Sequence, residues 1–142
     1  MSPARARERL LPVVTAFVLC DHVHQDLATE KRTILGATTR FPVTHGFPAR
    51  CSRVGVYACV SSVHAPCVFT VELLSVGDLH RLGPAARLGF LFPDDPLAGY
   101  EMHENYPDVG VPSPGKFLIR LCADGRPLQE LVVSFEVSEE SP

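Results

Sequence analysis

The chain has 142 residues, of which 46% are hydrophobic and 20% are charged, and its formal net charge is −3. This length corresponds to one domain, and this composition excludes a chain that is disordered throughout. A small negative charge without a long run of one sign also argues against the basic face that binds phosphates, so no nucleic-acid partner is expected.

Turn-forming residues and cysteines indicate the class and the compartment. The 13 prolines and 10 glycines are spread along the chain, which breaks long helices and favours short strands. The five cysteines are odd in number, widely spaced and without a Cys-x-x-Cys pair, so neither a zinc knuckle nor a thioredoxin-type site is expected. We therefore expect reduced core cysteines, a cytoplasmic protein and no cofactor.

The N-terminus combines basic residues with an apolar run. Arg5, Arg7 and Arg9 precede the apolar residues 10–20, which is the outline of a signal peptide. Glu8, Pro12 and the lack of a small-x-small cleavage site oppose that interpretation, and the run is shorter than the roughly 20 residues of a membrane-spanning helix. We expect a flexible arm over 1–11, then a buried strand, and no contact with a membrane.

The first half of the chain predicts four strands with turns between them. Residues 13–21 are apolar on both faces, which is typical of a strand in the middle of a sheet, and the polar residues 22–31 end it. Residues 33–41 resume β character and pair with it as a hairpin, with Gly36 at a bulge or a close contact. Two alternating segments follow, and their expected core faces are Val54, Val56, Ala58 and Val60, and then Cys67, Phe69, Val71 and Leu73.

Residues 77–116 are rich in proline and glycine and are the least regular segment. A loop of this length is abnormal inside a small domain. We therefore expect short strands at 88–92 and near 100–102, with irregular chain around them.

The last two β-like segments, 116–122 and 128–137, flank Asp124-Gly125. A two-residue turn would place Glu130 opposite Ile119, on an apolar face. A three-residue loop over 123–125, with Gly125 in the left-handed region, restores the pattern, because a shift of one residue moves every side chain to the other face. It groups Phe117, Ile119 and Leu121 with Leu131, Val133, Phe135 and Val137.

These elements predict an all-β fold. Residues 12–138 are expected to form a two-layer immunoglobulin-like β-sandwich of about seven to eight short, mostly antiparallel strands, followed by a disordered tail at 139–142. A closed barrel is the main alternative.

The pair His22 and His24 is the candidate metal site. Alternate residues of a strand point the same way, so both imidazoles reach one metal ion. His45, His64, His80 or His103 would have to supply a third ligand, and no spacing selects one of them. The competing interpretation is two histidines at the polar end of a strand.

No catalytic constellation emerges. The acidic residues Asp94, Asp95, Glu101, Glu104 and Asp108 match no calcium loop and are interpreted as a solvated segment. Ser61 and Ser62 lie near His64, but no Gly-x-Ser-x-Gly elbow is present, and Cys59 and Cys67 fall within strands.

Residues 90–114 are the candidate interaction surface. Tyrosine and methionine on loops of a rigid sheet are typical of protein interfaces. The expected contact residues are Phe92, Tyr100, Met102, His103 and Tyr106. The competing interpretation is that these side chains cover the open end of the sandwich.

Several short segments resemble a known family. They are Ala16-Phe17-Val18-Leu19-Cys20-Asp21, then Lys31 and Thr33-Ile34-Leu35-Gly36, Phe47-Pro48, Pro114-Gly115-Lys116-Phe117 and Asp124-Gly125. In this order they are similar to a bacterial family of short β-sandwich proteins classed as a domain of unknown function, over residues 13–137. The resemblance implies this fold and a cytoplasmic bacterial setting, and it assigns no catalytic residue.

The leading functional hypothesis is a non-enzymatic module that binds another protein through its loops. A metal-dependent enzyme or metal sensor using His22 and His24 is the first alternative. The second is a structural subunit that assembles into a homo-oligomer through exposed strand edges.

Overall fold

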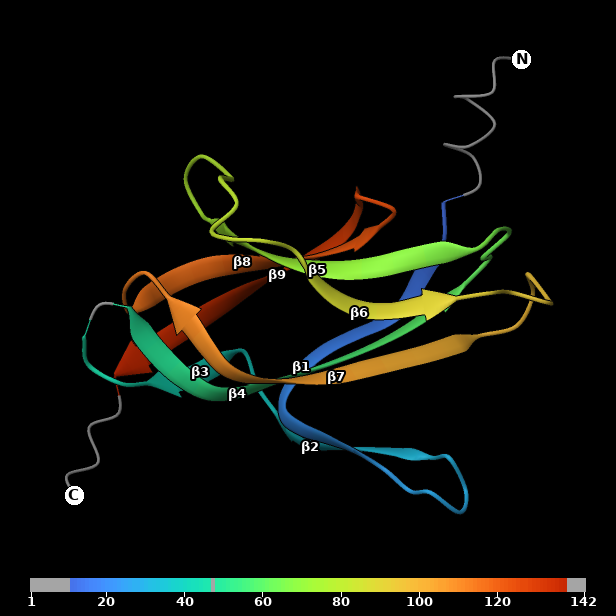
Figure 1. Cartoon of the computed structure of the whole chain (residues 1–142), viewed down its shortest axis with the longest axis horizontal. Helices are drawn as coiled ribbons and strands as arrows, with labels where there is room; N and C mark the ends of the chain where they lie inside the picture. The colour runs from blue at the N-terminus through green and yellow to red at the C-terminus, as the bar shows by residue number, and fades with distance from the viewer. Residues whose placement is uncertain (1–10, 47, 138–142) are drawn as a thin grey trace.

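Nine β-strands form two sheets in the computed structural model, which describes residues 11–46 and 48–137 (Figure 1). The strand order is β2-β1-β4-β7 in the first sheet and β3-β9-β8-β5-β6 in the second. The strands are β1 (Val13–Gln25), β2 (Arg32–Ala37), β3 (Arg40–Val43), β4 (Ala49–Ser61), β5 (Cys67–Ser75), β6 (Ala86–Leu91), β7 (Tyr100–Val111), β8 (Gly115–Ala123) and β9 (Arg126–Val137). The expected all-β sandwich is confirmed, with nine strands instead of seven or eight.

The ends of the chain bear on two further expectations. Residues 1–10 and 138–142 lie outside the described residues, and with them nearly all of the expected arm at 1–11 and the whole expected tail at 139–142. Within the described part, no helix is long and apolar enough to cross a membrane.

The strand order is that of an immunoglobulin-like sandwich. The neighbours β1, β4 and β7 correspond to strands A, B and E, and the neighbours β9, β8 and β5 correspond to G, F and C. β6 extends the second sheet beyond β5. β3 pairs with β9 in parallel, whereas the other strand pairs are antiparallel.

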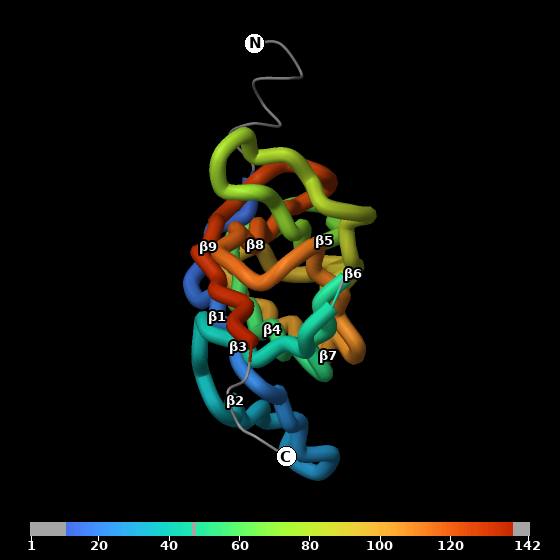
Figure 2. The backbone as a smooth tube through the Cα atoms, turned by 90° about the vertical axis from the view of Figure 1, so that its left-hand side faces the viewer, coloured from blue at the N-terminus to red at the C-terminus, as the bar shows by residue number. Residues whose placement is uncertain are grey.

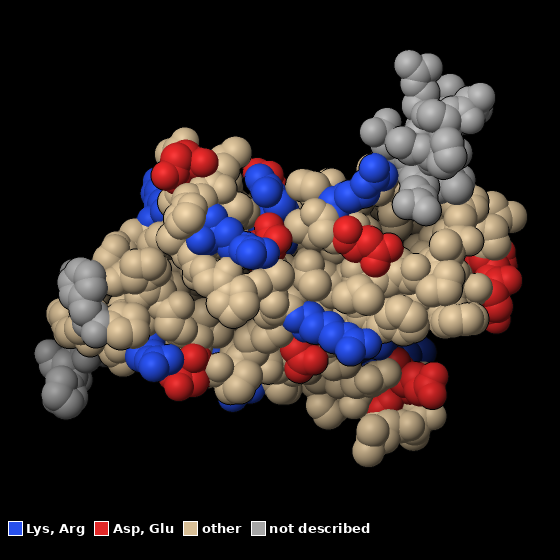
Figure 3. Space-filling model, turned by 45° about the horizontal axis from the view of Figure 1, so that its top comes forward, with Lys and Arg blue, Asp and Glu red and all other residues tan. Residues whose placement is uncertain are grey.

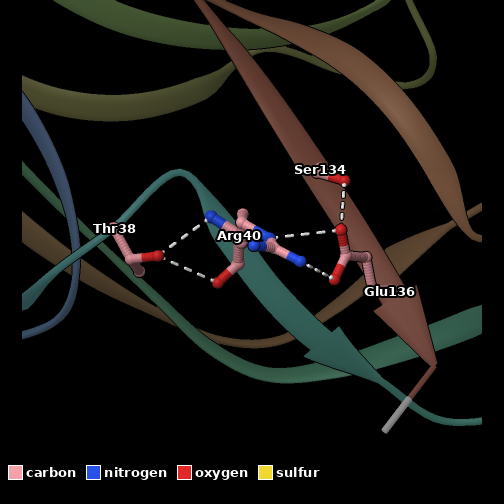
Figure 4. Close-up of polar contacts among 4 residues, drawn as sticks. All are labelled: Thr38, Arg40, Ser134 and Glu136. Atoms are coloured by element: carbon pink, nitrogen blue, oxygen red, sulfur yellow. Dashed lines mark hydrogen bonds and ion pairs between the residues drawn. The ribbon is translucent and has the colours of Figure 1, made fainter.

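The chain changes sheets between β2 and β3. We expected one strand over 33–41, but it divides because Ala37 pairs with β1 and Arg40 pairs with β9 in the opposite sheet. Arg40 makes a two-pronged contact with Glu136, with Nε–Oε1 and Nη2–Oε2 distances of 3.2 and 2.9 Å (Figure 4). Thr38 accepts a hydrogen bond from the Arg40 backbone N–H (3.0 Å), which shapes the crossing.

The core lies between the two sheets. Val54, Val56, Ala58 and Val60 are buried as expected, and so are Cys67, Phe69 and Val71, while Leu73 is half-buried. Phe135 is in contact with both Phe41 and Phe117, at ring-centroid distances of 6.0 and 5.9 Å. Buried residues of both sheets belong to one continuous apolar cluster.

β1 lies in the middle of its sheet as expected, but it continues to Gln25 where the polar residues 22–31 predicted its end. The end of β1 and all of β2 lie beyond the rest of the sandwich (Figures 1 and 2). Asn105 of β7 holds this part, because its amide bonds the backbone N–H and C=O of Val23 at 2.8 and 2.9 Å. β2 pairs with this part of β1, and Val23, which is opposite Ile34, is its one buried apolar side chain among polar neighbours, so the hydrophobic pattern gave little signal there.

β6 agrees with the strand expected at 88–92, whereas β7 is much longer than the piece expected near 100–102. β7 pairs with β4 from Tyr100 to Val111, and no described strand pairs with its other side. Pro107 is compatible with that position because an edge strand does not need every N–H for its ladder. The proline-rich pattern was therefore misleading.

The final hairpin has the predicted faces but a different turn. Ile119 pairs with Leu131, and both Phe117 and Val133 are buried. The turn nevertheless has two residues, Asp124 and Gly125, with φ of 48° and 79°, as a type I′ turn requires. A register shift beside Cys122 restores the parity, because Leu128 is the extra residue between the partners Gln129 and Pro127.

Replacement of Ile119 by Asp is expected to destabilise the domain by more than about 4 kcal/mol, because it buries a charge without a partner. Glu130→Ala on the opposite face removes only an exposed contact with Arg120 (2.8 Å) and is expected to cost less than about 1 kcal/mol. Urea unfolding of both variants measures these values. Equal tolerance of the two changes would contradict the assignment of faces.

Candidate functional site

A cluster of exposed hydrophobic side chains lies at the end of β6 and in the loop that follows it. We name Phe90, Phe92 and Leu97 the β6–β7 ridge; their exposed fractions are 46%, 78% and 90%. The two phenylalanine rings are 6.5 Å apart between centroids, and the Arg87 guanidinium lies 5.9 Å from the centroid of Phe90. The ridge therefore places apolar surface beside a cation at the edge of the second sheet.

Tyr100 holds the loop that carries the ridge. Its hydroxyl oxygen accepts hydrogen bonds from the backbone N–H groups of Asp94 and Asp95 at 3.3 and 3.1 Å. The hydroxyl proton has two acceptors within reach, the Asp94 carboxylate and the Asp95 carbonyl, both at 3.0 Å. Asp95 in turn accepts a hydrogen bond from the N–H of Leu97 (2.9 Å). The loop is therefore ordered around the Tyr100 hydroxyl.

Only part of the expected contact surface is exposed. Phe92 is exposed, Tyr100 and His103 are half-buried, and Tyr106 is half-buried with its hydroxyl donating to the Arg87 carbonyl at 2.7 Å. Met102 is 5% exposed and belongs to the core, which corrects its assignment to a contact surface. It points inward because it lies on the core side of β7, where it pairs with the buried Ala58 of β4.

Sequence reasoning named the segment 90–114 but missed Phe90 and Leu97 as contact residues. Leu88 is buried, and strict alternation would place Phe90 on the same inner face. The register shift between Phe69 and Thr70 leaves Leu88 as an extra residue of β6, so Phe90 is turned outward instead. Alternation therefore predicts the wrong face for Phe90, and Leu97 is exposed by the path of the loop, so the sequence carried no signal for either residue.

His22 and His103 are both bonded to arginines. Nδ1 of His22 accepts from Arg53 at 2.7 Å, and Nδ1 of His103 accepts from Arg32 at 2.8 Å. His24 is exposed on the same strand as His22. A guanidinium next to His22 opposes a second cation there, and the described residues contain no group of three or more His, Cys, Asp or Glu suited to a metal ion.

The candidate acidic residues do not converge. Asp94 and Asp95 lie in the loop around Tyr100, while Glu101, Glu104 and Asp108 are spread along β7. Glu101 accepts a hydrogen bond from the Tyr57 hydroxyl (2.6 Å), which occupies one of its oxygens. This arrangement agrees with the interpretation of separate surface carboxylates.

The cysteines have the environment of core residues. All five are free thiols, and Cys59 alone among them is half-buried instead of buried. Burial raises the pKa of Cys67 to about 12 and that of Cys122 to about 11. These two thiols stay protonated at neutral pH, which disfavours a nucleophilic role.

His103 gives the domain a pH-dependent stability. Burial lowers its pKa below the usual 6.5, and the Arg32 cation lowers it further. The unfolded chain then binds more protons in mildly acidic solution, so the free energy of unfolding is expected to fall as the pH drops through about 6.5. Urea unfolding at pH 7.5 and 5.5 should show a smaller fall for His103→Gln than for the wild type. An identical fall in both proteins would contradict the prediction.

Comparisons with known proteins give a family and a fold. A comparison with curated proteins finds no match. Among solved structures, the Pseudomonas fluorescens alkylpurine DNA glycosylase AlkC bound to DNA containing an abasic site analog is similar with a TM-score of 0.53 and 9% identity, over 85% of this chain and 30% of that chain. An immunoglobulin-like protein from Pseudomonas aeruginosa has a TM-score of 0.43 and 12% identity, over 89% of this chain and 97% of that chain.

At such identities the likeness to the glycosylase concerns the fold alone, and the chain corresponds to less than a third of that enzyme. The family comparison covers much more of the sequence. A model described as a family of unknown function (DUF6941) matches residues 15–136, which include every described strand except the ends of β1 and β9. The chain therefore belongs to this family of unknown function, DUF6941.

Proposed function

We propose that the protein is a non-enzymatic protein-binding module and that the β6–β7 ridge is its contact surface. The observation that carries this proposal is the exposure of Phe90 at the end of β6 and of Phe92 and Leu97 in the following loop, which Tyr100 orders. Large apolar side chains held in place before binding lose little conformational entropy when a partner covers them. Isolated exposed hydrophobics are common, but here the Phe90 and Phe92 rings lie 6.5 Å apart and the exposed Leu97 follows in the same loop.

The free edge of β6 adds a second means of binding. Among the described strands β6 pairs only with β5, so its other side offers backbone groups to an extended segment. The ridge is too small to form a standard interface of about 1,600 Å² alone and would act as its anchor. This arrangement defines the chemistry of the partner. It has an extended segment that pairs with β6, an apolar pocket beside that segment for the phenylalanines, and a carboxylate that binds Arg87.

Charge and cysteines support this setting. Basic and acidic side chains lie next to one another over the face drawn in Figure 3, without a broad area of one sign. Such a surface favours a protein partner over a nucleic acid. The five free thiols favour a reducing compartment such as the cytoplasm.

A second copy of the chain is the alternative partner. Of the two edges on this flank, β7 carries Glu101, Glu104, Pro107 and Asp108, which disfavour strand pairing. β6 carries only Arg87 and shows the exposed ridge. Pairing of two β6 edges would give a dimer, which light scattering after size-exclusion chromatography detects as a doubled mass.

The variant Phe92→Asp tests the ridge. We expect it to abolish partner binding while the free energy of unfolding changes by less than about 0.5 kcal/mol, because the side chain is exposed. The matched control is Leu27→Asp, which places the same charge at a leucine between β1 and β2 that is even more exposed than Phe92.

The measurement is quantitative affinity purification from the native host with the wild type and both variants. The proposal expects specific proteins that the wild type and Leu27→Asp retain and Phe92→Asp loses. Recovery of the same proteins by all three chains, together with a monomeric mass for each, would contradict it.

A further inference from the structure

A pocket opens on the flank of the sandwich, between β7 and the connection that joins β5 to β6. Its volume is about 270 Å³. Val54 and Tyr106 line it from the first sheet, Val71, Leu73 and Ile119 line it from the second sheet, and Leu82 lines it from the connection. It reaches the centre of the molecule, because Phe135 of β9 forms part of its wall.

The pocket exists because β6 covers only half of β5. β6 pairs with residues 67–71 of β5, and beyond Val71 the place of a neighbouring strand is taken by the connection. There the N–H of Leu82 donates to the Leu73 carbonyl at 2.8 Å. The flank is therefore not closed by a strand, and Val71 and Ile119 keep exposed fractions of 8% and 6% while Leu121 and Val133 keep none.

The lining offers no unpaired charge. The Glu72 carboxylate is directed to Arg81 and Arg120, at 3.5 and 4.0 Å, and Glu72 is the one ionised residue of the wall. The Tyr106 hydroxyl is already engaged with the Arg87 carbonyl. Transfer of a charged group into these surroundings is strongly unfavourable, whereas an apolar group gains by leaving water.

We propose that this inter-sheet pocket binds a small, uncharged, apolar molecule. An apolar cavity of about 150 Å³ accepts a benzene ring, so a volume of 270 Å³ accepts roughly two fused rings or an aliphatic chain of about eight carbons. The site is separate from the β6–β7 ridge, since no ridge residue lines it. The two proposals can therefore fail independently.

Isoleucine methyl NMR tests the location of binding directly. The chain has two isoleucines, Ile119 in the pocket wall and Ile34 on β2, outside it. Addition of 1-naphthylamine, a fluorescent probe of two fused rings that is uncharged at neutral pH, is expected to shift the Ile119 δ1-methyl signal saturably and to leave Ile34 in place. The fluorescence of the probe should rise with a stoichiometry of one and a dissociation constant on the order of 10 μM.

Two variants in which phenylalanine replaces an alanine test whether filling the pocket blocks binding. Ala86→Phe places a ring against the pocket wall, whereas Ala37→Phe places the same ring at the exposed end of β2. We expect Ala86→Phe to weaken probe binding about tenfold or more and Ala37→Phe to leave it unchanged. If Ala86→Phe does not fold, the NMR titration of the wild type still decides the question. No saturable binding, equal shifts of both isoleucines, or equal affinities of the two folded variants would overturn the proposal.

Discussion

Burial of alternating apolar side chains between two sheets is the constraint on which the structure depends. From Val54 to Val60, β4 contributes a valine or alanine at every second position, and β8 and β9 contribute Phe117, Ile119, Val133 and Phe135 from the other layer. A change of parity in any of these strands would expose its apolar face. The bulge beside Cys122 illustrates this constraint. It allows the final hairpin to have a type I′ turn while the apolar faces of β8 and β9 both point toward the core.

The same constraint explains where the flank of the sandwich is left open. A sandwich is closed along its flanks only where the edge strands of both sheets run side by side. β6 is half as long as β7, so one stretch of the flank is closed by a connection and not by a strand. The inter-sheet pocket is a direct result of this difference in length, and its apolar lining is core surface that no strand covers.

The proposed contact surface depends on a different device. Tyr100 sits at the start of β7 and uses its hydroxyl to gather the backbone of the preceding loop. A hydroxyl that serves several backbone groups orders a loop without burying hydrophobic side chains. Phe92 and Leu97 are thereby held outside, and the apolar surface that they expose remains available to a partner. The proposed contact surface therefore lies at a loop, while the packed sheets provide the stability of the domain.

The sequence by itself determined the all-β class, the central position of β1 and the faces of β4, β5, β8 and β9, because period-two alternation is a local property with one consistent solution. It also indicated the segment that contains Phe92. Only the tertiary structure decided that β1 continues over polar residues, that residues 32–43 divide between two sheets and that β7 is a long edge strand. Those features depend on backbone pairing with distant strands and on the Asn105 amide, and pairing partners leave no mark on hydrophobic periodicity. For the same reason Met102 was assigned to the surface and the pocket was not foreseen: both follow from which strand lies beside which.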